Sequence, residues 1–316
     1  MLRFALKVDI VIVHYKDVGS LALCLEALSK QTASPNRVFI VDNSADLPEL
    51  TYPLLDITIL RPQHNIGFAA ACNLAVAQSR SDWVAFLNPD AFANEDWLEK
   101  LTACAGSNPQ ITSFSSKQTF YEAPDLLDGS GDNYHISGFY WRRGYMKAAT
   151  RHYPSEVFSA SGTAMLVKRK SFLELGGFDE QLFTYGEDVD LGFRLRLAGH
   201  ACMYCEDATV QHKGYATSGG RYSEFALYHG HRNLVWVFFK NMPLPFLILF
   251  LPLHIAANMA AILKFGLKGQ GKTVFRAKVD AILGLKTILS QRKKVQKQRH
   301  ISLLSLWQIF TKSTRR

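Results

Sequence analysis

The first half of the chain alternates short apolar runs with segments of helical spacing. The runs are rich in β-branched residues, which predicts buried parallel strands. These runs lie at 8–14, 37–41, 57–60 and 82–87. Apolar residues repeat every three or four positions over 20–31, and 67–78 is rich in alanine, so both segments are predicted to be helices. Strands that alternate with helices predict an α/β fold with a mostly parallel central sheet.

The pattern is less regular from 119 to 153 and regains strand character at 159–167. A long helix is predicted after Glu187, with Leu191 and Leu195 facing inward and Gly199 close to its end.

Polar side chains follow three of the predicted strands, in the segments 14–15, 42–43 and 88–90. Asn and Asp also favour turns, which is the alternative explanation for any one of them. Ligands of open α/β sheets bind at the carboxyl ends of strands, so together the three segments predict one shared crevice.

Acidic residues gather between Asp179 and Asp190, where five carboxylates fall within twelve residues. Glu187 and Asp188 stand where a loop turns into a helix, a place from which a carboxylate can be aimed into a cleft. A negative charge at a helix start is also favoured by the helix dipole alone. Asp190 and Arg194 are spaced as an i,i+4 pair and are expected to be structural.

The character of the chain changes near Asn241. Residues 243–263 are mostly apolar and nearly long enough to span a bilayer, but they include three prolines, a histidine and an asparagine. An interfacial element, a true span and a helix packed on the domain all remain open. From Lys264 to the end there are 14 Lys and Arg residues and one acid, Asp280. We therefore expect a domain at 1–240 and an apolar, basic, helical membrane-associating region at 241–316.

Composition sets wider limits. The chain has 316 residues, is 48% hydrophobic and carries a formal charge of +9, which suits a large packed domain and excludes a disordered chain. The five scattered cysteines do not resemble a disulfide framework, and the pair Cys202 and Cys205 is expected to lie in a buried strand. Residues 1–7 lack the apolar segment of a signal peptide, so we expect a reducing cytoplasm.

Several short motifs occur in a fixed order along residues 8–240: VIVHY (11–15), VDNS (41–44), NIGFAAACN (65–73), LNPDA (87–91), SGTAM (161–165), GGFDE (176–180), YGEDVD (185–190), His212 and Arg232-Asn233. With this ordered set the chain resembles the inverting glycosyltransferases of family 2, which have the GT-A fold, and most of all their rhamnosyltransferase-like branch.

The resemblance implies transfer of a sugar from a nucleoside diphosphate donor, dTDP- or UDP-linked, to a glycan or polyprenyl-linked acceptor. It also implies a divalent metal, Mg²⁺ or Mn²⁺, to neutralise the diphosphate. Asn88-Pro-Asp90 stands where the family has Asp-X-Asp, which leaves Asp90 as the metal ligand and Asn88 as a neutral contact. His212 matches the downstream histidine that can complete the metal shell.

The remaining roles are carried over in the same way. Asp188 takes the position of the general base, with Glu187 beside it to orient the acceptor. Ser161, Gly162 and Trp141 are expected at the acceptor, and Asp128 and Asp132 in the same groove. The residues expected to contact the donor are Val13, Tyr15, Asp42, Asn43, Asn65, Gly67, Asn73 and Asn88.

The expected function is metal-dependent, inverting transfer of L-rhamnose from dTDP-rhamnose in bacterial surface polysaccharide synthesis, at the cytoplasmic face of the inner membrane. A transferase with another donor, a UDP-hexose or UDP-galactofuranose, remains open. The remote alternative is a basic nucleic-acid-binding protein. Because the basic residues of the tail are interleaved with Ile, Leu and Trp307, they suit a lipid surface better, and no nucleic acid partner is expected.

Overall fold

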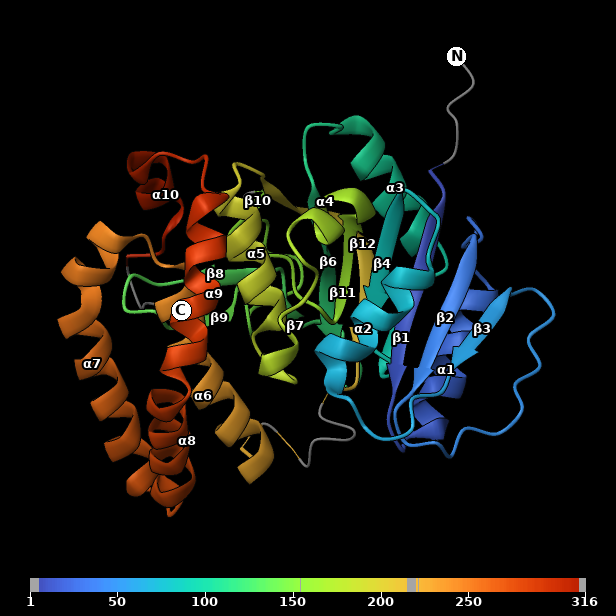
Figure 1. The fold of residues 1–316 in the computed structure, drawn as a ribbon. Coiled ribbons are helices and arrows are strands. Elements are labelled where there is room, and N and C mark those ends of the chain that lie inside the picture. Colours follow the sequence, from blue (N-terminus) through green and yellow to red (C-terminus); the bar gives the residue numbers. More distant parts are fainter. Residues whose placement is uncertain (1–5, 154, 215–219, 221, 313–316) are drawn as a thin grey trace.

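One large mixed sheet organises the protein, seen here in a computed structural model that describes residues 6–153, 155–214, 220 and 222–312 (Figure 1). In spatial order its strands are β10 (Glu156–Val157), β12 (Cys202–His212), β6 (Ser113–Phe120), β11 (Ala164–Lys168), β4 (Trp83–Leu87), β1 (Val8–His14), β2 (Arg37–Asp42) and β3 (Ile57–Leu60). β5 (Ala91–Ala93) pairs with β12 and β7 (Leu127–Gly129) with β6, while β8 (Asp132–Tyr134) and β9 (Tyr140–Arg142) form a separate hairpin.

The pairing of the strands confirms the predicted fold class. β4, β1, β2 and β3 are parallel neighbours, and β12 runs parallel to β6. β11 is antiparallel to both β4 and β6, so it reverses the sheet direction in the middle. The carboxyl ends of β1, β2 and β4 therefore meet at one edge, as the sequence predicts.

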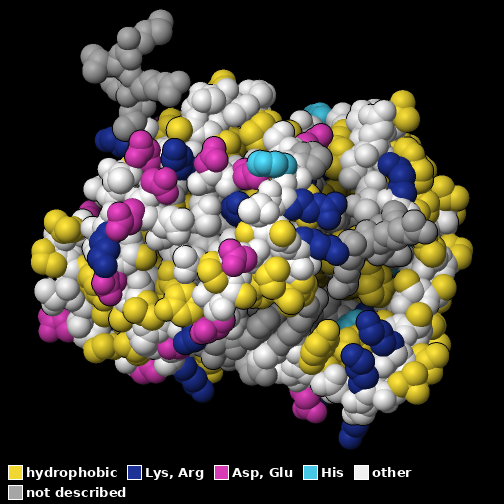
Figure 2. All heavy atoms as spheres, turned by 180° about the vertical axis from the view of Figure 1, so that it is seen from behind, with side chains coloured by type: hydrophobic (Ala, Val, Ile, Leu, Met, Phe, Trp, Pro, Cys, Tyr) yellow, Lys and Arg dark blue, Asp and Glu magenta, His cyan; other side chains and the backbone are white. Residues whose placement is uncertain are grey.

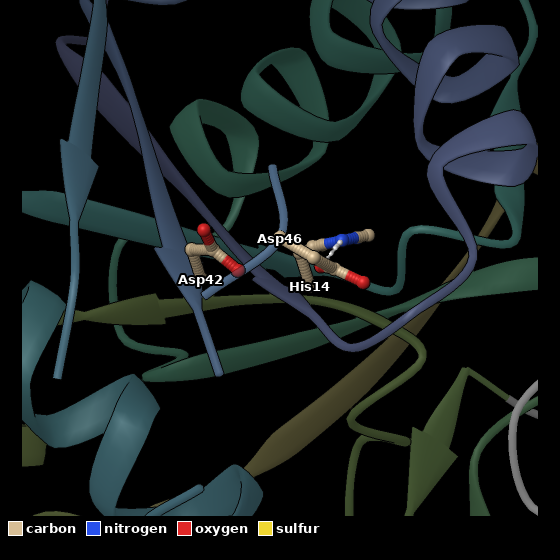
Figure 3. A group of neighbouring side chains, drawn as sticks. All are labelled: His14, Asp42 and Asp46. Atoms are coloured by element: carbon tan, nitrogen blue, oxygen red, sulfur yellow. Dashed lines mark hydrogen bonds and ion pairs between the residues drawn. The ribbon is translucent and has the colours of Figure 1, made fainter. Parts of the chain in front are cut away.

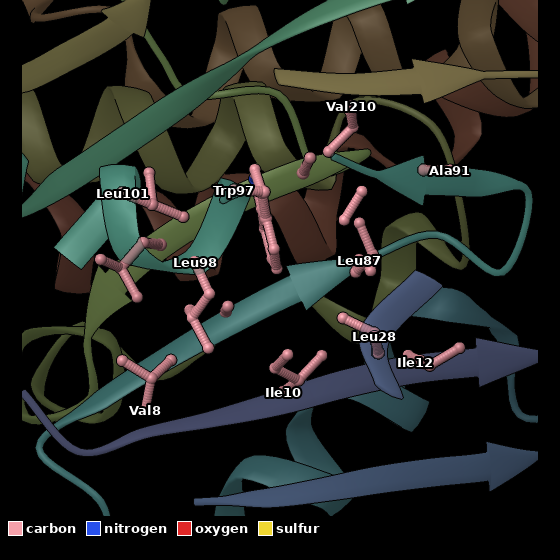
Figure 4. Close-up of a cluster of buried hydrophobic side chains, with 14 of the residues drawn as sticks. Val8, Ile10, Ile12, Leu28, Leu87, Ala91, Trp97, Leu98, Leu101 and Val210 are labelled. Atoms are coloured by element: carbon pink, nitrogen blue, oxygen red, sulfur yellow. The ribbon is translucent and has the colours of Figure 1, made fainter. Parts of the chain in front are cut away.

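Helices cover both faces of the sheet. α1 (Val18–Ser29) and α3 (Trp97–Ser107) bury one apolar cluster with β1 and β4, and Figure 4 shows Val8 and Ile10 of β1 lying near Leu98 of α3. α2 (Gly67–Gln78), α4 (Arg169–Glu174) and α5 (Glu187–Leu197) contribute to a second cluster on the other face. A short 3₁₀ turn, η1 (Glu180–Leu182), precedes α5.

Most predicted elements of the first half are confirmed, and the ends of β1, β3 and α2 match the expectation. The predicted strand at 159–167 is only partly formed, because the ladder with β4 covers Ala164–Lys168. The backbone N–H of Gly162 bonds the carboxylate of Asp188 instead of a neighbouring strand.

Five helices form the C-terminal part: α6 (Glu224–Asn241), α7 (Leu244–Gly266), α8 (Gly271–Leu283), α9 (Leu285–Lys297) and α10 (Leu303–Ile309). They share a third apolar cluster with α5 and β8, and that cluster includes Phe193, Phe238 and Phe310. Thr311 then returns to the β8–β9 hairpin, where its N–H donates to Tyr134 O at 2.9 Å. The two regions expected on either side of residue 240 therefore differ in sequence character, but their apolar side chains pack in one shared core.

α7 is the one helix among the described residues that is long and apolar enough to cross a membrane. It has a mean hydropathy of 2.2 in its most apolar window, of which only 22% is buried.

The structure contains one disulfide, which was not predicted from the sequence. α3 and β12 bring the sulfurs of Cys104 and Cys205 together in a disulfide. The two residues are 101 positions apart, so no short cysteine spacing in the sequence predicts this disulfide. Cys24, Cys72 and Cys202 are buried free thiols, as expected for core residues.

Candidate active site

The carboxyl ends of β1 and β2 and the start of α2 bring four of the predicted donor residues together. Asp42 ends β2 and is fully buried. Asn43 follows it and donates from Nδ2 to Gly67 O at 3.2 Å, while Asn65 Oδ1 accepts the Gly67 N–H at 2.9 Å. These contacts fix the loop before α2 against the ends of the strands.

Gly67 has a positive φ of 84°, which favours glycine at this position. A Cβ here would lie 2.5 Å from the ring of Phe183, so the glycine allows the loop before α5 to pack closely. Three more predicted donor contacts lie at the carboxyl ends of strands: Val13 is buried near the end of β1, Tyr15 is half-buried just after it, and Asn88 follows β4.

Asn73 has a different place from the one expected. Its side chain accepts the Phe178 N–H at 2.9 Å and donates to Phe178 O and to Glu180 Oε1 at the same distance. Because its amide is occupied by this loop, Asn73 joins α2 to the segment before α5, and we assign it to the scaffold and not to the donor.

Two groups in this part of the chain have ligand chemistry for a cation. The first consists of His14, Asp42 and Asp46, whose ligand atoms lie within 4.8 Å of one another (Figure 3). Asp42 already accepts backbone N–H groups from Ser44 at 3.3 Å and Leu47 at 3.2 Å. Its carboxylate is thus a fixed hydrogen-bond acceptor at the edge where the nucleoside of the donor is expected.

The second group joins the two predicted metal ligands. His212 Nε2 lies 3.3 Å from Asp90 Oδ1, and His212 Nδ1 lies 2.6 Å from Asp128 Oδ2. Asp128 also forms an ion pair with Arg142 of β9. Burial disfavours the charged form of His212, but its hydrogen bonds to Asp128 and Asp90 outweigh this and raise its pKa. Asp128 therefore holds one ring nitrogen of His212 while the other faces Asp90.

The loop before β11 links this pair to Asp188. Asp188 Oδ2 accepts the N–H of Gly162 at 2.8 Å, and the next residue, Thr163, accepts the N–H of Asn88 at 2.9 Å. Asn88 stands two positions before Asp90. The two predicted halves of the site, base and metal ligands, thus flank one short loop that also contains the buried Ser161.

Three carboxyl groups surround this point, the buried Glu187 and Asp132 and the half-buried Asp188, and their environments differ. Burial, followed by the charge of Asp188, raises the pKa of both Glu187 and Asp132 well above the ordinary range. Burial also raises the pKa of Asp188, but N–H groups of Gly162 and Val189 donate to its carboxylate and oppose the shift. Asp188 is therefore the member of the three best supported as an anion.

Tyr140 of β9 lies against the start of α5, next to Glu187. Gly186, at the N-cap of α5, has a φ of 86°, and a Cβ there would collide with the Tyr140 hydroxyl. That hydroxyl and Glu187 Oε2 are both buried without a hydrogen-bond partner among the described residues. They are two polar atoms at the start of α5 that a bound hydroxyl compound can satisfy.

Asp190, two positions further along α5, is bound on every side. It accepts hydrogen bonds from Arg194 Nε at 2.9 Å and Asn241 Nδ2 at 2.7 Å, and Lys240 Nζ lies 2.7 Å away. Burial alone would raise its pKa, but Lys240 and Arg194 outweigh this and lower it. The pairing of Asp190 with Arg194 is thus confirmed, and it ties α5 to the end of α6.

Trp141 lies on the other face of the β8–β9 hairpin from the site. Asp132 and Arg142 are cross-strand partners, as are Asn133 and Trp141, and successive side chains of a strand point to opposite faces. Asp132 and Arg142 face the buried carboxylates, whereas the Trp141 ring lies 6.0 Å from that of His135. The structure therefore separates Trp141 from the other predicted acceptor residues.

Sequence reasoning missed Arg142 and Tyr140, and it gave Asp128 and Asp132 only a general place in a groove. All four come from the irregular segment at 119–153, whose β7, β8 and β9 have three residues each. The available signal was the density of Asp beside aromatic residues there, which marks a polar wall but not the partner of each side chain.

Comparison with known proteins settles the family. The model of "Glycosyl transferase family 2" matches residues 9–176, which is more than half of the chain. This chain is a family 2 glycosyltransferase. A relative from Mycobacterium tuberculosis, "N-acetylglucosaminyl-diphospho-decaprenol L-rhamnosyltransferase", is 30% identical over 251 residues, which cover 70% of this glycosyltransferase and 80% of the relative. The "O-antigen chain rhamnosyltransferase RfbN" of Salmonella typhimurium is 26% identical, with 66% of each protein covered.

Solved structures agree on the fold of this glycosyltransferase. Residues 1–349 of S. aureus TarS, solved with UDP-GlcNAc, superpose with a TM-score of 0.59 at 16% identity and cover 92% of the chain and 91% of that structure. GalNAc-T7, solved with UDP, GalNAc and Mn²⁺, gives a TM-score of 0.60 at 16% identity and covers 74% of the chain and 48% of that protein. Both support the GT-A-like architecture and nothing finer.

Proposed function

We propose that this glycosyltransferase moves L-rhamnose from dTDP-rhamnose to a lipid-linked saccharide in surface polysaccharide synthesis, with inversion at the anomeric carbon. The observation that carries the proposal is the placement of Asp188 and the Asp90–His212 pair on the two sides of one loop. The names of the two rhamnosyltransferase relatives support the sugar, and the name of the M. tuberculosis relative supports the lipid-linked acceptor.

Asp188 acts as the general base in this proposal. The acceptor hydroxyl must lose a proton as its oxygen attacks the anomeric carbon, and a carboxylate at hydrogen-bond distance can take it. Each Asp188 oxygen accepts one backbone N–H and keeps a second lone pair for the hydroxyl. Glu187 and Tyr140 orient the acceptor through their unpartnered polar atoms. Attack from the face opposite the leaving diphosphate inverts the configuration.

A divalent cation fits the other side of the loop. Asp90 and His212 converge to within 3.3 Å, and Asp128 fixes the second ring nitrogen of His212, which is the usual arrangement around a metal-binding histidine. Mg²⁺ or Mn²⁺ held there would neutralise the charge of the leaving diphosphate. Asp42, Asn43 and the loop at Asn65 and Gly67 would bind the nucleoside.

The site of action is the cytoplasmic face of the inner membrane. The M. tuberculosis relative is named for an acceptor on decaprenol, a lipid. α7, with its exposed apolar residues, supports contact with the membrane that holds such an acceptor.

The test uses the purified full chain with a polyprenyl diphosphate saccharide and a donor panel of dTDP-rhamnose, UDP-glucose and UDP-galactofuranose. We expect fastest release of dTDP and, by NMR, an α-linked product from the β-linked donor. A faster reaction with either UDP sugar would overturn the rhamnosyl assignment alone. Retained turnover in Asp188→Asn and Asp90→Ala, with the exposed Asp82→Asn as the matched control, would overturn the site assignment.

A further inference from the structure

The polarity of α7 is inverted relative to a helix of a soluble protein. The residues that it buries against the domain include His254 and Asn258, which are only 3% and 9% exposed. The opposite side, here called the outer face of α7, consists of large apolar residues that are 54–67% exposed: Leu244, Ile248, Leu249, Ile255, Met259 and Leu263. A helix with its polar residues toward protein and its apolar residues outward is built for a lipid environment.

The inward residues are committed to the domain. His254 Nδ1 lies 2.7 Å from Ser137 O, and its ring stacks on Phe238 with centroids 3.9 Å apart. Asn258 donates to His254 O at 2.7 Å. Phe250 near one end of α7 and Phe265 near the other are also buried. Because α7 is attached along nearly its whole length of roughly 35 Å, it cannot cross a bilayer without carrying the packed domain with it.

The end where α7 meets α8 adds positive charge. Four exposed cations, here called the basic end, lie there: Lys264, Lys268, Lys272 and Arg276. Leu267 and Phe275 are 83% and 58% exposed among them. Asp280, paired with Arg276 at 3.7 Å, is the single acid of the chain beyond residue 264. Figure 2, viewed from behind, shows hydrophobic side chains along the right-hand edge and Lys and Arg at the lower right.

From this geometry we propose that α7 lies flat in the headgroup region of an anionic bilayer, with its outer face toward the acyl chains and the basic end among the phosphates. The occupant is a lipid surface because the apolar stripe and the cations occur together, which suits an interfacial helix. This inference rests on the proposed function in one respect, the lipid-linked acceptor, and adds which surface meets the membrane.

The basic end contacts the described residue just before α6. Gln270 Nε2 donates to Tyr222 O at 2.6 Å, and the Tyr222 ring lies 6.2 Å from that of Phe265. Tyr222 stands just before α6 and ten positions after His212. Figure 1 places the α7–α8 end at the same end of the molecule as the start of α6. In the proposed docking the start of α6 therefore also lies near the headgroups, the level at which the diphosphate of a lipid-linked acceptor lies.

The first test is co-flotation of the full chain with two kinds of vesicle: phosphatidylcholine alone, or phosphatidylcholine with about 30% phosphatidylglycerol. The anionic phosphatidylglycerol gives the second kind a negative surface potential. We expect binding to the anionic vesicles, weakened about 100-fold by Lys264→Gln/Lys268→Gln/Lys272→Gln at about 1 kcal/mol per lysine. The control Lys30→Gln/Lys100→Gln/Lys170→Gln removes the same charge elsewhere and should leave binding unchanged. Equal loss in both variants would overturn the assigned surface.

The second test distinguishes lying from spanning. Nitroxide labels on Ile248→Cys, Ile255→Cys and Leu263→Cys should report similar shallow depths in the anionic vesicles by power-saturation EPR. A deep maximum at 255 between two shallow ends would overturn the flat placement. Donor hydrolysis by the lysine variants in solution should match the wild type. Loss of flotation with intact hydrolysis supports the membrane surface, while intact flotation without any transferase activity would refute the proposed function alone.

Discussion

Two carboxylates on α5 of this glycosyltransferase, the half-buried Asp188 and the fully buried Asp190, have opposite surroundings. Asp188 sits among other acids, and its pKa is raised by burial. Asp190 sits between Lys240 and Arg194, which lower its pKa. Desolvation favours a higher pKa for both carboxyl groups, so the neighbours decide whether a carboxylate keeps a lone pair for a substrate or serves the scaffold. The difference teaches that the acidic stretch contains two units: one that we propose for the chemistry, and one that holds α5 in place.

The largest effect that would sharpen this comparison is the loss of the proposed base. We expect Asp188→Asn to lower kcat by roughly 10²–10⁴, because the amide cannot accept the hydroxyl proton. The thermal unfolding midpoint should change little. The wild-type rate should fall on the acidic side at a pH above the ordinary Asp range, since the raised pKa means that the base is protonated earlier. An unchanged kcat would remove Asp188 from the mechanism.

The second effect belongs to Asp190. We expect Asp190→Asn to lower the free energy of unfolding by about 3–5 kcal/mol, because Lys240 and Arg194 would remain buried without their shared anion. Its lowered pKa means that the stabilisation is present above the ordinary Asp pKa and is lost as the pH falls through the folded-state value. Urea unfolding at pH 7 and at lower pH should show that the difference in free energy of unfolding between Asp190→Asn and the wild type becomes smaller as the pH falls. A loss of activity without any loss of stability would reverse the two roles.

A smaller effect is expected at Asp128, which positions His212 and touches neither substrate in our proposal. Asp128→Asn should weaken Mn²⁺ binding about 10–100-fold, the usual cost of removing a carboxylate behind a metal-binding histidine. EPR of free Mn²⁺ measures this without turnover. The exposed Asp125→Asn is the matched control. Equal affinity in both variants would argue that the cation is bound elsewhere, with the His14–Asp42–Asp46 group as the next candidate.

The smallest effect concerns Glu187. Its raised pKa means that the folded protein retains a proton which the unfolded chain releases, so wild-type stability declines as the pH rises through the ordinary Glu range. Glu187→Gln lacks this proton exchange, and we expect it to be about 1 kcal/mol more stable than the wild type near neutral pH. Unfolding series from pH 4 to 8 measure the two slopes. Parallel slopes would mean that Glu187 is ionised in the folded protein.

Much of the fold could be predicted because its signals are local. The apolar pattern within a segment was enough to predict the strands at 8–14 and 57–60 and the helix at 67–78. The Cys104–Cys205 pair is not local, since α3 and β12 meet only in the folded sheet.

The site divides in the same way. Asp90, His212 and Asp188 occur in ordered motifs, whereas Asp128 beside His212 and Tyr140 beside Glu187 come from three-residue strands that have no periodicity to reveal them. The different placement of Asn73 has the same origin. Its sequence neighbourhood resembles a donor loop, but the loop at Phe178 reaches its amide from 105 positions away. Which surface of α7 is buried likewise depends on contacts with Ser137 and Phe238.

The return of Thr311 to the β8–β9 hairpin has a practical consequence for making this enzyme. A shortened version that stops after residue 240, designed for solubility, would remove Phe310 from the cluster around Phe193 and Phe238 and strip Tyr134 of its backbone partner. Asp132 and Arg142 stand on that same hairpin. Such a truncation would keep all the sequence motifs but weaken the packing of the β8–β9 hairpin beside the proposed site. Solubility is therefore better sought by replacing exposed apolar residues of α7 one at a time.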